Sequence, residues 1–144
     1  MKKLMNVLTI LIFTVSSASA ETVLYCTSEL ATGMIYANGK WNAGDFSKSR
    51  YTVKFDDDPM TSNKSITVKI KSSYESIPTS YTCLDKKENQ LVHICNAKRG
   101  KVFFYSIVKK RFTLISGAFY SYVRGDTANY YDTQSISSGT CTDF

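Results

Sequence analysis

His93 is the residue best suited to acid/base chemistry, because the chain has one histidine and its side chain titrates near neutral pH. It lies in the run Leu91-Val92-His93-Ile94-Cys95, where strict alternation places it on the same strand face as Leu91 and Cys95. A nucleophile for it to activate is hard to find, since cysteines in disulfides offer no thiolate and there is no Gly-x-Ser-x-Gly elbow. The pattern favours a strand histidine held by hydrogen bonds, and we expect no enzymatic activity.

Metal ligation is the next chemistry that the residue types suggest. Asp56-Asp57-Asp58, followed by Pro59 and Asn63, offers oxygen ligands for calcium but lacks the central glycine and closing glutamate of a calcium loop. A zinc site would need more than one histidine or a Cys-x-x-Cys spacing, and the chain has neither. A solvated turn is therefore the better interpretation of the aspartates, and we expect no metal and no cofactor.

The cysteines point to covalent cross-links instead. An even number of cysteines in an exported chain indicates disulfides, and four cysteines allow three pairings. Cys83 and Cys95 flank the polar segment 85–90, which is typical of a hairpin tip, whereas Cys26 and Cys141 lie near the two ends of the mature chain. We therefore expect the pairs Cys26–Cys141 and Cys83–Cys95.

Export is predicted from residues 1–20, which have the three parts of a cleavable signal peptide. Lys2 and Lys3 form the positive start, Leu4 to Val15 the apolar run, and Ala18-Ser19-Ala20 the small-residue cleavage site. The apolar run is too short to span a bilayer, which takes roughly 20 residues. We expect a periplasmic or secreted protein that does not span the membrane, with residues 21–144 as a single β-domain.

Charge adds little about partners. Removing Lys2 and Lys3 with the signal still leaves more basic than acidic side chains, and the basic ones are dispersed. Dispersed charge supports non-specific association only, so no specific nucleic-acid binding is expected. The densest basic groups are Lys98-Arg99-x-Lys101 and Lys109-Lys110-Arg111, which border apolar strands and are typical of solvated turns.

The segments that carry the histidine, aspartates and cysteines lie among runs in which apolar and polar side chains alternate. Such a period of two indicates half-buried strands. Runs of this kind, or runs rich in β-branched and aromatic residues, are Val23 to Thr27, Met34 to Ala37, Tyr51 to Phe55, Ile66 to Lys71, Ser80 to Leu84, Leu91 to Cys95, Val102 to Val108, Arg111 to Ile115 and Ala118 to Val123. Such spacing predicts an all-β fold, an antiparallel meander of about eight strands forming a small barrel or a sandwich.

Connections can be placed as well. Asn38-Gly39 between Tyr36 and Trp41 is a strong two-residue hairpin signal, and Lys109-Lys110 is expected to be a turn. Ser116-Gly117 marks a turn or a bulge, and Glu29 to Met34 is compatible with one short helical turn. The predicted long loops are 56–65, 72–79 and 125–138.

The aromatic content suggests a binding surface. Ten tyrosines and eight phenylalanines exceed what a small core conceals completely. Packing on strand surfaces accounts for most of them, but tyrosines among dispersed Arg and Lys are also the residues of protein-binding and sugar-binding faces.

Two resemblances can be stated. The pattern of Cys26, then Ala31-Thr32-Gly33, Tyr36 to Trp41 and Asp45-Phe46 resembles a family of small exported bacterial proteins of unknown function, as do Phe103 to Phe112 and the ending Gly139-Thr140-Cys141. This resemblance spans nearly all of the mature chain and implies a secreted β-domain.

A second, more local resemblance is to bacterial periplasmic inhibitors of lysozyme, which are small β-barrels with a disulfide. The stretch Ser116-Gly117-Ala118-Phe119-Tyr120-Ser121 is similar to the Ser-Gly-x-x-Tyr-Ser segment with which that family approaches the lysozyme cleft. The resemblance implies partner contacts at Ser116 and Tyr120 and a lysozyme as the partner.

Three functions from different classes are therefore compatible with the sequence. The first is a protein-binding or inhibitory module, the second a barrel that carries a small apolar or sugar ligand, and the third an enzyme. A carrier requires a cavity of roughly 300 Å³ or more lined by apolar side chains, and an enzyme requires His93 beside a carboxylate in a cleft. Partner, ligand and oligomeric state are not encoded in any motif that we recognise.

Overall fold

The computed structural model describes residues 21–59, 65–84, 91–117 and 133–143 of the 144-residue chain. Within these ranges the chain is almost entirely β, with a single 3₁₀ turn at Lys98–Gly100 and no α-helix. The strands are β1 (Thr22–Ala37), β2 (Lys40–Asp45), β3 (Arg50–Phe55), β4 (Thr67–Ser72), β5 (Thr79–Cys83), β6 (Val92–Ala97), β7 (Lys101–Ser106), β8 (Arg111–Gly117) and β9 (Thr133–Asp143). The predicted all-β class is confirmed.

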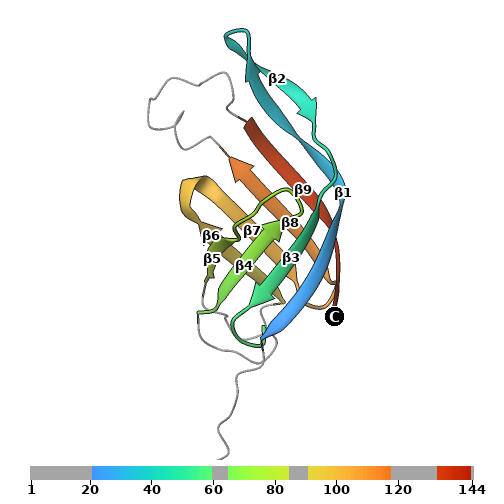
Figure 1. Cartoon of the computed structure of the whole chain (residues 1–144), viewed down its shortest axis with the longest axis vertical. Coiled ribbons are helices and arrows are strands. Elements are labelled where there is room, and N and C mark those ends of the chain that lie inside the picture. The colour runs from blue at the N-terminus through green and yellow to red at the C-terminus, as the bar shows by residue number, and fades with distance from the viewer. Residues whose placement is uncertain (1–20, 60–64, 85–90, 118–132, 144) are drawn as a thin grey trace, which may run out of the picture.

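These strands close into a barrel rather than a sandwich. From β3 to β9 each strand pairs antiparallel with the next, and β1 pairs with both β3 and β9, so that the first and last strands complete the ring. Strand β2 lies outside this ring and pairs with the second half of β1, forming a hairpin that extends beyond the barrel (Figure 1). We call the end of the barrel next to this hairpin the upper end and the opposite end the lower end.

Along one edge, strand β1 pairs with two different strands, β3 and β2. Thr22 to Thr27 pair with β3, whereas Thr32 to Ala37 pair with β2 across the Asn38-Gly39 turn. A bulge between Ser28 and Leu30 separates the two halves. The expected helical turn at Glu29 to Met34 is therefore wrong, because a bulge shifts the alternation by one residue and hides the period of two. The predicted hairpin at Asn38-Gly39 is confirmed, with both residues at positive φ.

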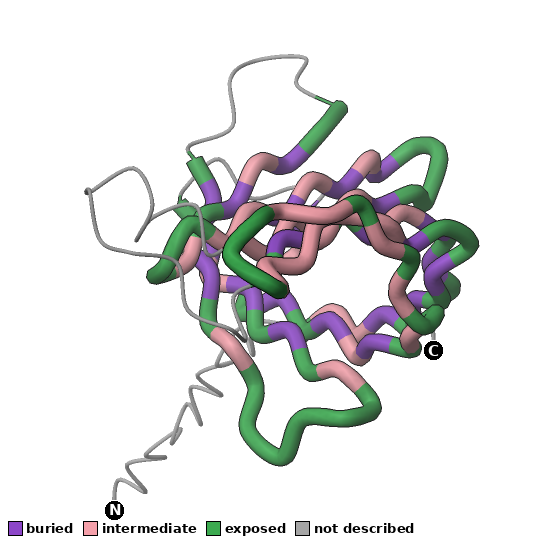
Figure 2. Tube along the Cα trace, turned by 90° about the horizontal axis from the view of Figure 1, so that it is seen from above, coloured by how far each residue is buried: buried purple, intermediate pink, exposed green. Residues whose placement is uncertain are grey.

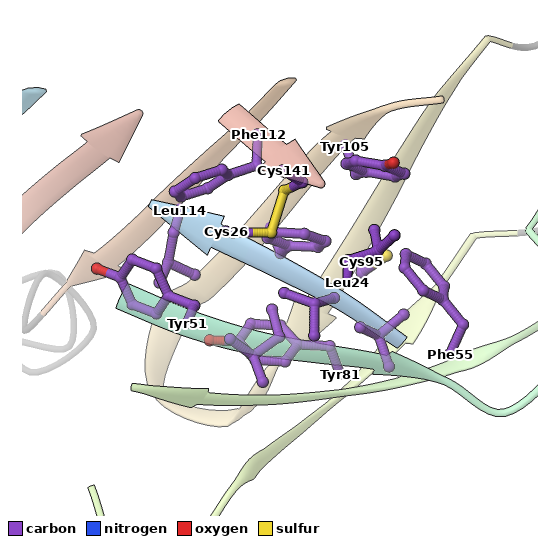
Figure 3. Close-up of a cluster of buried hydrophobic side chains, with 14 of the residues drawn as sticks. Leu24, Cys26, Tyr51, Phe55, Tyr81, Cys95, Tyr105, Phe112, Leu114 and Cys141 are labelled. Atoms are coloured by element: carbon purple, nitrogen blue, oxygen red, sulfur yellow. A yellow bond between two sulfur atoms is a disulfide. The ribbon is translucent and has the colours of Figure 1, made fainter. Parts of the chain in front are cut away.

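The barrel interior is filled by the inward faces of the strands. Seen from above, buried positions alternate with more exposed ones along the strands of the ring (Figure 2). The side chains at the centre are almost fully buried and come from strands on all sides: Leu24, Val53, Phe55, Val68 and Phe103. Phe103 stacks on both Tyr105 and Phe112, with ring centroids 6.3 Å apart in each pair. Burying this cluster (Figure 3) contributes roughly 25 cal/mol per Å² of apolar surface and is the main source of stability.

Both expected disulfides are confirmed, and each joins residues that lie directly opposite in neighbouring strands. Cys26–Cys141 links β1 to β9, where the ring closes. Cys83–Cys95 links β5 to β6, which share only two residue pairs. The second bridge therefore holds the most weakly paired seam of the described barrel.

Two boundaries differ from expectation. Residues 133–138, predicted as the end of a long loop, are the first half of β9, and Ser116-Gly117 end β8 rather than forming a turn or bulge. The inward side chains of this half of β9 are Ser135 and Ser137, so it lacks the apolar alternation by which strands are predicted. The expected strand Ala118 to Val123 and the signal peptide at 1–20 lie outside the described residues. Within the described part, no helix is long and apolar enough to cross a membrane.

Candidate functional site

His93 is held in the barrel wall as a packed residue. It is buried on the inward face of β6, as is Cys95, and its ring lies 6.0 Å from that of Phe55. Its Nε2 is hydrogen-bonded to the carbonyl oxygen of Pro59 at 2.9 Å. This bond connects the strand to the segment that follows β3, so the ring has a structural task of its own.

The aspartates after β3 serve as turn residues. The Asp56 carboxylate accepts a hydrogen bond from the Thr67 N–H at 2.7 Å, and that of Asp57 accepts one from the Asp58 N–H at 2.8 Å. Such side-chain to backbone bonds are the ordinary chemistry of an Asp-rich turn. Nowhere in the described ranges do three or more His, Cys, Asp or Glu residues gather as they would around a metal ion.

Ser116 belongs to the upper rim of the barrel. It is half-buried at the end of β8, its side chain shares the inward face of Phe112 and Leu114, and it pairs with Ser135 of β9. Tyr120 lies outside the described residues. The contact role that the lysozyme-inhibitor resemblance implies for Ser116 and Tyr120 stays a prediction.

Two of the hollows bordered by described residues lie at the ends of the barrel. Near Ser116 the upper end has a hollow of about 150 Å³ bordered by Tyr51, Tyr81, Glu75 and Lys101. Glu75 and Lys101 form an ion pair at 3.8 Å. Burial, followed by the charge of Glu75 and the proximity of Tyr51, raises the pKa of Tyr81 far above its usual value, so this hydroxyl keeps its proton.

At the lower end a larger hollow of about 360 Å³ is lined by apolar atoms of Leu24, Pro59, Tyr105 and Ile107. Its volume reaches the size expected of a ligand carrier. The barrel centre beyond it is packed, however, with Phe55 and Phe103 almost fully buried. A ligand here would therefore stay at the mouth of the barrel and would not be enclosed.

The outer surface shows the clearest asymmetry of the molecule. On β3, β4 and β5 every outward side chain is polar or basic: Arg50, Thr52, Lys54, Thr67, Lys69, Lys71, Ser80 and Thr82. On the other side of the barrel, outward positions of β6 to β9 and the adjoining part of β1 carry apolar side chains among polar ones such as Asn96, Thr113 and Ser138. We call this second surface the apolar face and define it by Leu30, Met34, Val92, Ile94, Val102, Phe104, Ile115 and Ile136.

Strand register makes the apolar face continuous. Ile94 lies opposite Phe104, and Val102 opposite Ile115, which in turn lies opposite Ile136 of β9. Several members are well exposed, including Leu30 at 59% and Ile136 at 45%. Single exposed apolar residues are normal on a protein surface, and a set of neighbouring ones on one face is a candidate interaction site.

The projecting hairpin extends this face. Tyr36 and Trp41 lie opposite each other on β1 and β2, two residues beyond Met34, and their rings meet edge to face at 5.4 Å. Both rings remain partly exposed. Trp and Tyr are the residues most enriched where binding energy concentrates, so the hairpin adds an aromatic arm to the apolar face.

Two hollows interrupt the apolar face. The first, about 310 Å³, lies over β7 and β8 and is bordered by Val92, Phe104, Thr113 and Ser138, with the ion pair Arg111–Glu29 (3.9 Å) at its margin. The second, about 140 Å³, lies over β8, β9 and β1 and is bordered by Met34, Ile115, Gln134 and Ile136. Together they make this surface concave in two places, where side chains of a docking partner could pack.

Basic residues border the apolar face at both ends. Lys98 and Arg99 form the upper turn between β6 and β7, and Lys109 and Lys110 the lower turn between β7 and β8. Lys110 pairs with Asp143. Lys98, Arg99 and Lys109 are exposed and make no ion pair within the described part of the chain. The surface thus combines an apolar centre with a basic margin.

Searches for similar proteins found no matching family model, curated protein or solved structure.

Proposed function

We propose that this protein is an exported protein-binding module, and that its apolar face docks on a partner protein whose surface has an apolar centre and acidic margins. The observation that carries this proposal is the contrast between the two outer surfaces of one barrel. Nothing in barrel stability calls for Phe104, Ile115 and Ile136 at outward positions where β3 to β5 use Thr, Ser and Lys. The acidic margin follows from charge complementarity with Lys98, Arg99 and Lys109.

Three further features support this proposal over the alternatives. The barrel centre is filled, so a carried ligand could bind only at the barrel mouth. His93 is packed in the barrel wall and hydrogen-bonded to Pro59, which argues against a catalytic role. Two disulfides fit an oxidising compartment such as the periplasm or the medium. Ser116 borders the second hollow of the apolar face as well as the upper rim, so the lysozyme hypothesis involves the same region.

The test uses the oxidised mature protein as bait against periplasmic extract and host fluids, with lysozyme inhibition assayed alongside. Phe104→Lys places a charge at the centre of the apolar face, and Thr52→Lys is its matched control on the polar surface. Both positions face outward on strands, so both variants should fold. We expect Phe104→Lys to weaken binding of the captured protein at least tenfold, since central interface residues contribute about 2 kcal/mol or more, and Thr52→Lys to leave it unchanged.

Other occupants of the apolar face give different results. A wild-type protein that is dimeric in solution and monomeric as Phe104→Lys would show that the face binds a second copy of this chain. Binding to anionic vesicles that Phe104→Lys abolishes would show a lipid surface instead. Either result, or equal loss of binding in the two variants, would overturn the proposed function.

A further inference from the structure

The hollow at the upper end of the barrel gathers hydroxyl groups that have no hydrogen-bond partner. Tyr51 and Tyr81 are only 9% and 2% exposed, and both border this hollow together with Ser116. None of the three hydroxyls makes a hydrogen bond within the part of the chain that the structure describes. A tyrosine as deeply buried as these normally has a partner for its hydroxyl, so the absence of one calls for an explanation.

The tyrosine hydroxyls can be reached from the hollow. Both rings come from inward positions, Tyr51 on β3 and Tyr81 on β5, and their hydroxyls point toward the same end of the barrel (Figure 3). Among the described side chains, the polar atom that is both inaccessible and without a hydrogen bond is Gln134 Oε1. The hydroxyl of Tyr81 therefore keeps accessible surface, and since the rest of this residue is buried at the hollow, that surface faces into it.

Two charged side chains complete the polar lining. Glu75 and Lys101 border the same hollow, and their ion pair of 3.8 Å is too long for a hydrogen bond. A hydroxyl of a ligand can therefore accept from the ammonium group and donate to the carboxylate without displacing an existing bond between them. Because the two charges cancel, the hollow favours neither a cation nor an anion.

These groups together match a neutral ligand that is rich in hydroxyls. Tyrosine and serine hydroxyls both donate and accept, a carboxylate only accepts, and an ammonium group only donates. The volume of about 150 Å³ equals the share of about five water molecules, which is room for one edge of a sugar ring. Ile70 and Leu114 supply the apolar part of the lining, against which the C–H groups of a sugar can pack. A purely apolar ligand would leave the hydroxyls and charges unpaired.

We propose that this hollow is a carbohydrate-binding site: one edge of a neutral monosaccharide unit enters the upper mouth of the barrel, and its hydroxyls replace water at the three protein hydroxyls and the ion pair. Such a replacement is favourable when the ligand reproduces the hydrogen bonds of the displaced water. The site lies inside the barrel mouth, whereas the apolar face lies on the outer surface. The inference therefore goes beyond the proposed function and does not depend on it.

The test is an NMR titration of the oxidised mature protein. The probes are the methyl glycosides of glucose, galactose, mannose and N-acetylglucosamine, and the comparison probes are glycine and inorganic phosphate. We expect at least one glycoside to shift the ring signals of Tyr51 and Tyr81 and the methyl signals of Leu114, with a dissociation constant on the order of 1 mM for a ligand of this size. Glycine and phosphate should shift none of them.

Tyr81→Phe provides the variant, because it keeps the ring and removes one hydroxyl of the site. Its matched control is Tyr105→Phe, which removes a hydroxyl at the lower end of the barrel. We expect Tyr81→Phe to bind the glycoside about fivefold more weakly, which is the contribution of one hydrogen bond, and Tyr105→Phe to bind it like the wild type.

Several results would overturn the carbohydrate site. They are the absence of shifts with all four glycosides, equal affinity of the two variants, and binding of glycine or phosphate at the same residues. Contacts of the Tyr81 ring with residues 118–132 in the free protein would also overturn it, because the chain would then fill its own hollow. The titration of the wild-type protein keeps its meaning even if Tyr81→Phe does not fold.

The outcome for this site is separable from that for the apolar face. Phe104→Lys should bind the glycoside with unchanged affinity, and Tyr81→Phe should capture the partner protein as the wild type does. A protein that captures no partner and still binds a glycoside would refute the proposed function and leave the carbohydrate site in place.

Discussion

At the scale of single residues, tyrosine hydroxyls placed at the barrel ends make stability sensitive to alkaline pH. An unfolded chain loses the tyrosine proton near pH 10. In the folded barrel, burial first, then Glu75 and Tyr51, raises the pKa of Tyr81 well above that value, and burial also raises the pKa of Tyr105. Below pH 10 both states hold the proton and the contribution to stability is complete. Above it the unfolded state ionises first, so the free energy of unfolding falls as pH rises.

Tyr81→Phe should reduce this loss. Between about pH 8 and pH 11, urea unfolding of the variant should show a shallower decline in the free energy of unfolding than that of the wild type. Tyrosinate absorbance of the folded protein gives an independent readout. A Tyr81→Phe protein whose pH dependence matches that of the wild type would contradict the buried hydroxyl.

Small residues explain why β9 and its contribution to the apolar face could not be predicted from the sequence. A Cβ atom on Gly139 would overlap the carbonyl oxygen of Thr27, and one on Gly33 would overlap that of Gln134. The close approach of β1 and β9 therefore requires glycine at these two inward positions, and with serines at inward positions beside them β9 lacks an apolar signature. Gln134, a polar residue in a polar-looking run, carries no sequence signal for the hollow that it borders.

At the scale of elements, the seam between β5 and β6 is the weak point of the ring. These strands share two residue pairs, against eleven between β1 and β9, and the Cys83–Cys95 bridge joins one of the two. The bridge contributes about 3 kcal/mol by restricting the unfolded chain, and at this seam it also supports local pairing. The Cys26–Cys141 bridge closes a longer loop and contributes about 4 to 5 kcal/mol. It lies in the extensively paired β1 and β9, so local pairing there depends less on the bridge.

Removing the two bridges separately should distinguish these roles. In the Cys83→Ala/Cys95→Ala protein we expect amide hydrogens of β5 and β6 to exchange faster than those of β3 and β4. In the Cys26→Ala/Cys141→Ala protein we expect a larger loss of unfolding free energy, without selective exchange at one strand pair. Uniform exchange across the barrel in the first protein would show that β5 and β6 hold together without their bridge.

The elements themselves were largely predictable, because most strands bury one face and so alternate in the sequence. The ranges Tyr51 to Phe55 and Arg111 to Ile115 agree closely with β3 and β8. Hairpin and end-to-end spacing favoured the observed disulfide pairs among the three possible pairings. The bulge in β1 was not predictable, since one extra residue reverses the alternation and resembles a helical step. The choice of a barrel over a sandwich was also not predictable, because it depends on the pairing of β1 with β9, which lie far apart in the chain.

At the scale of the whole molecule, the barrel has one surface suited to water and one suited to a partner. Alternation reveals which residues face outward, but only closure of the ring shows that Phe104, Ile136 and Met34 lie on the same side and that Tyr36 and Trp41 extend it. This arrangement joins apolar residues from both ends of the sequence into one surface. The same closure gathers the basic turns at its margins, and these favour fast association with an acidic partner at low salt.

Site-specific photo-crosslinking in the producing cell tests this account most directly. A benzophenone amino acid is placed at Phe104 on the apolar face or at Thr82 on the polar surface, and the cells are irradiated while the protein occupies its natural compartment. We expect the Phe104 position to give one discrete adduct with another protein and the Thr82 position to give none. An adduct from Thr82 alone, or from neither position, would contradict the assignment of the apolar face as the surface by which this protein works.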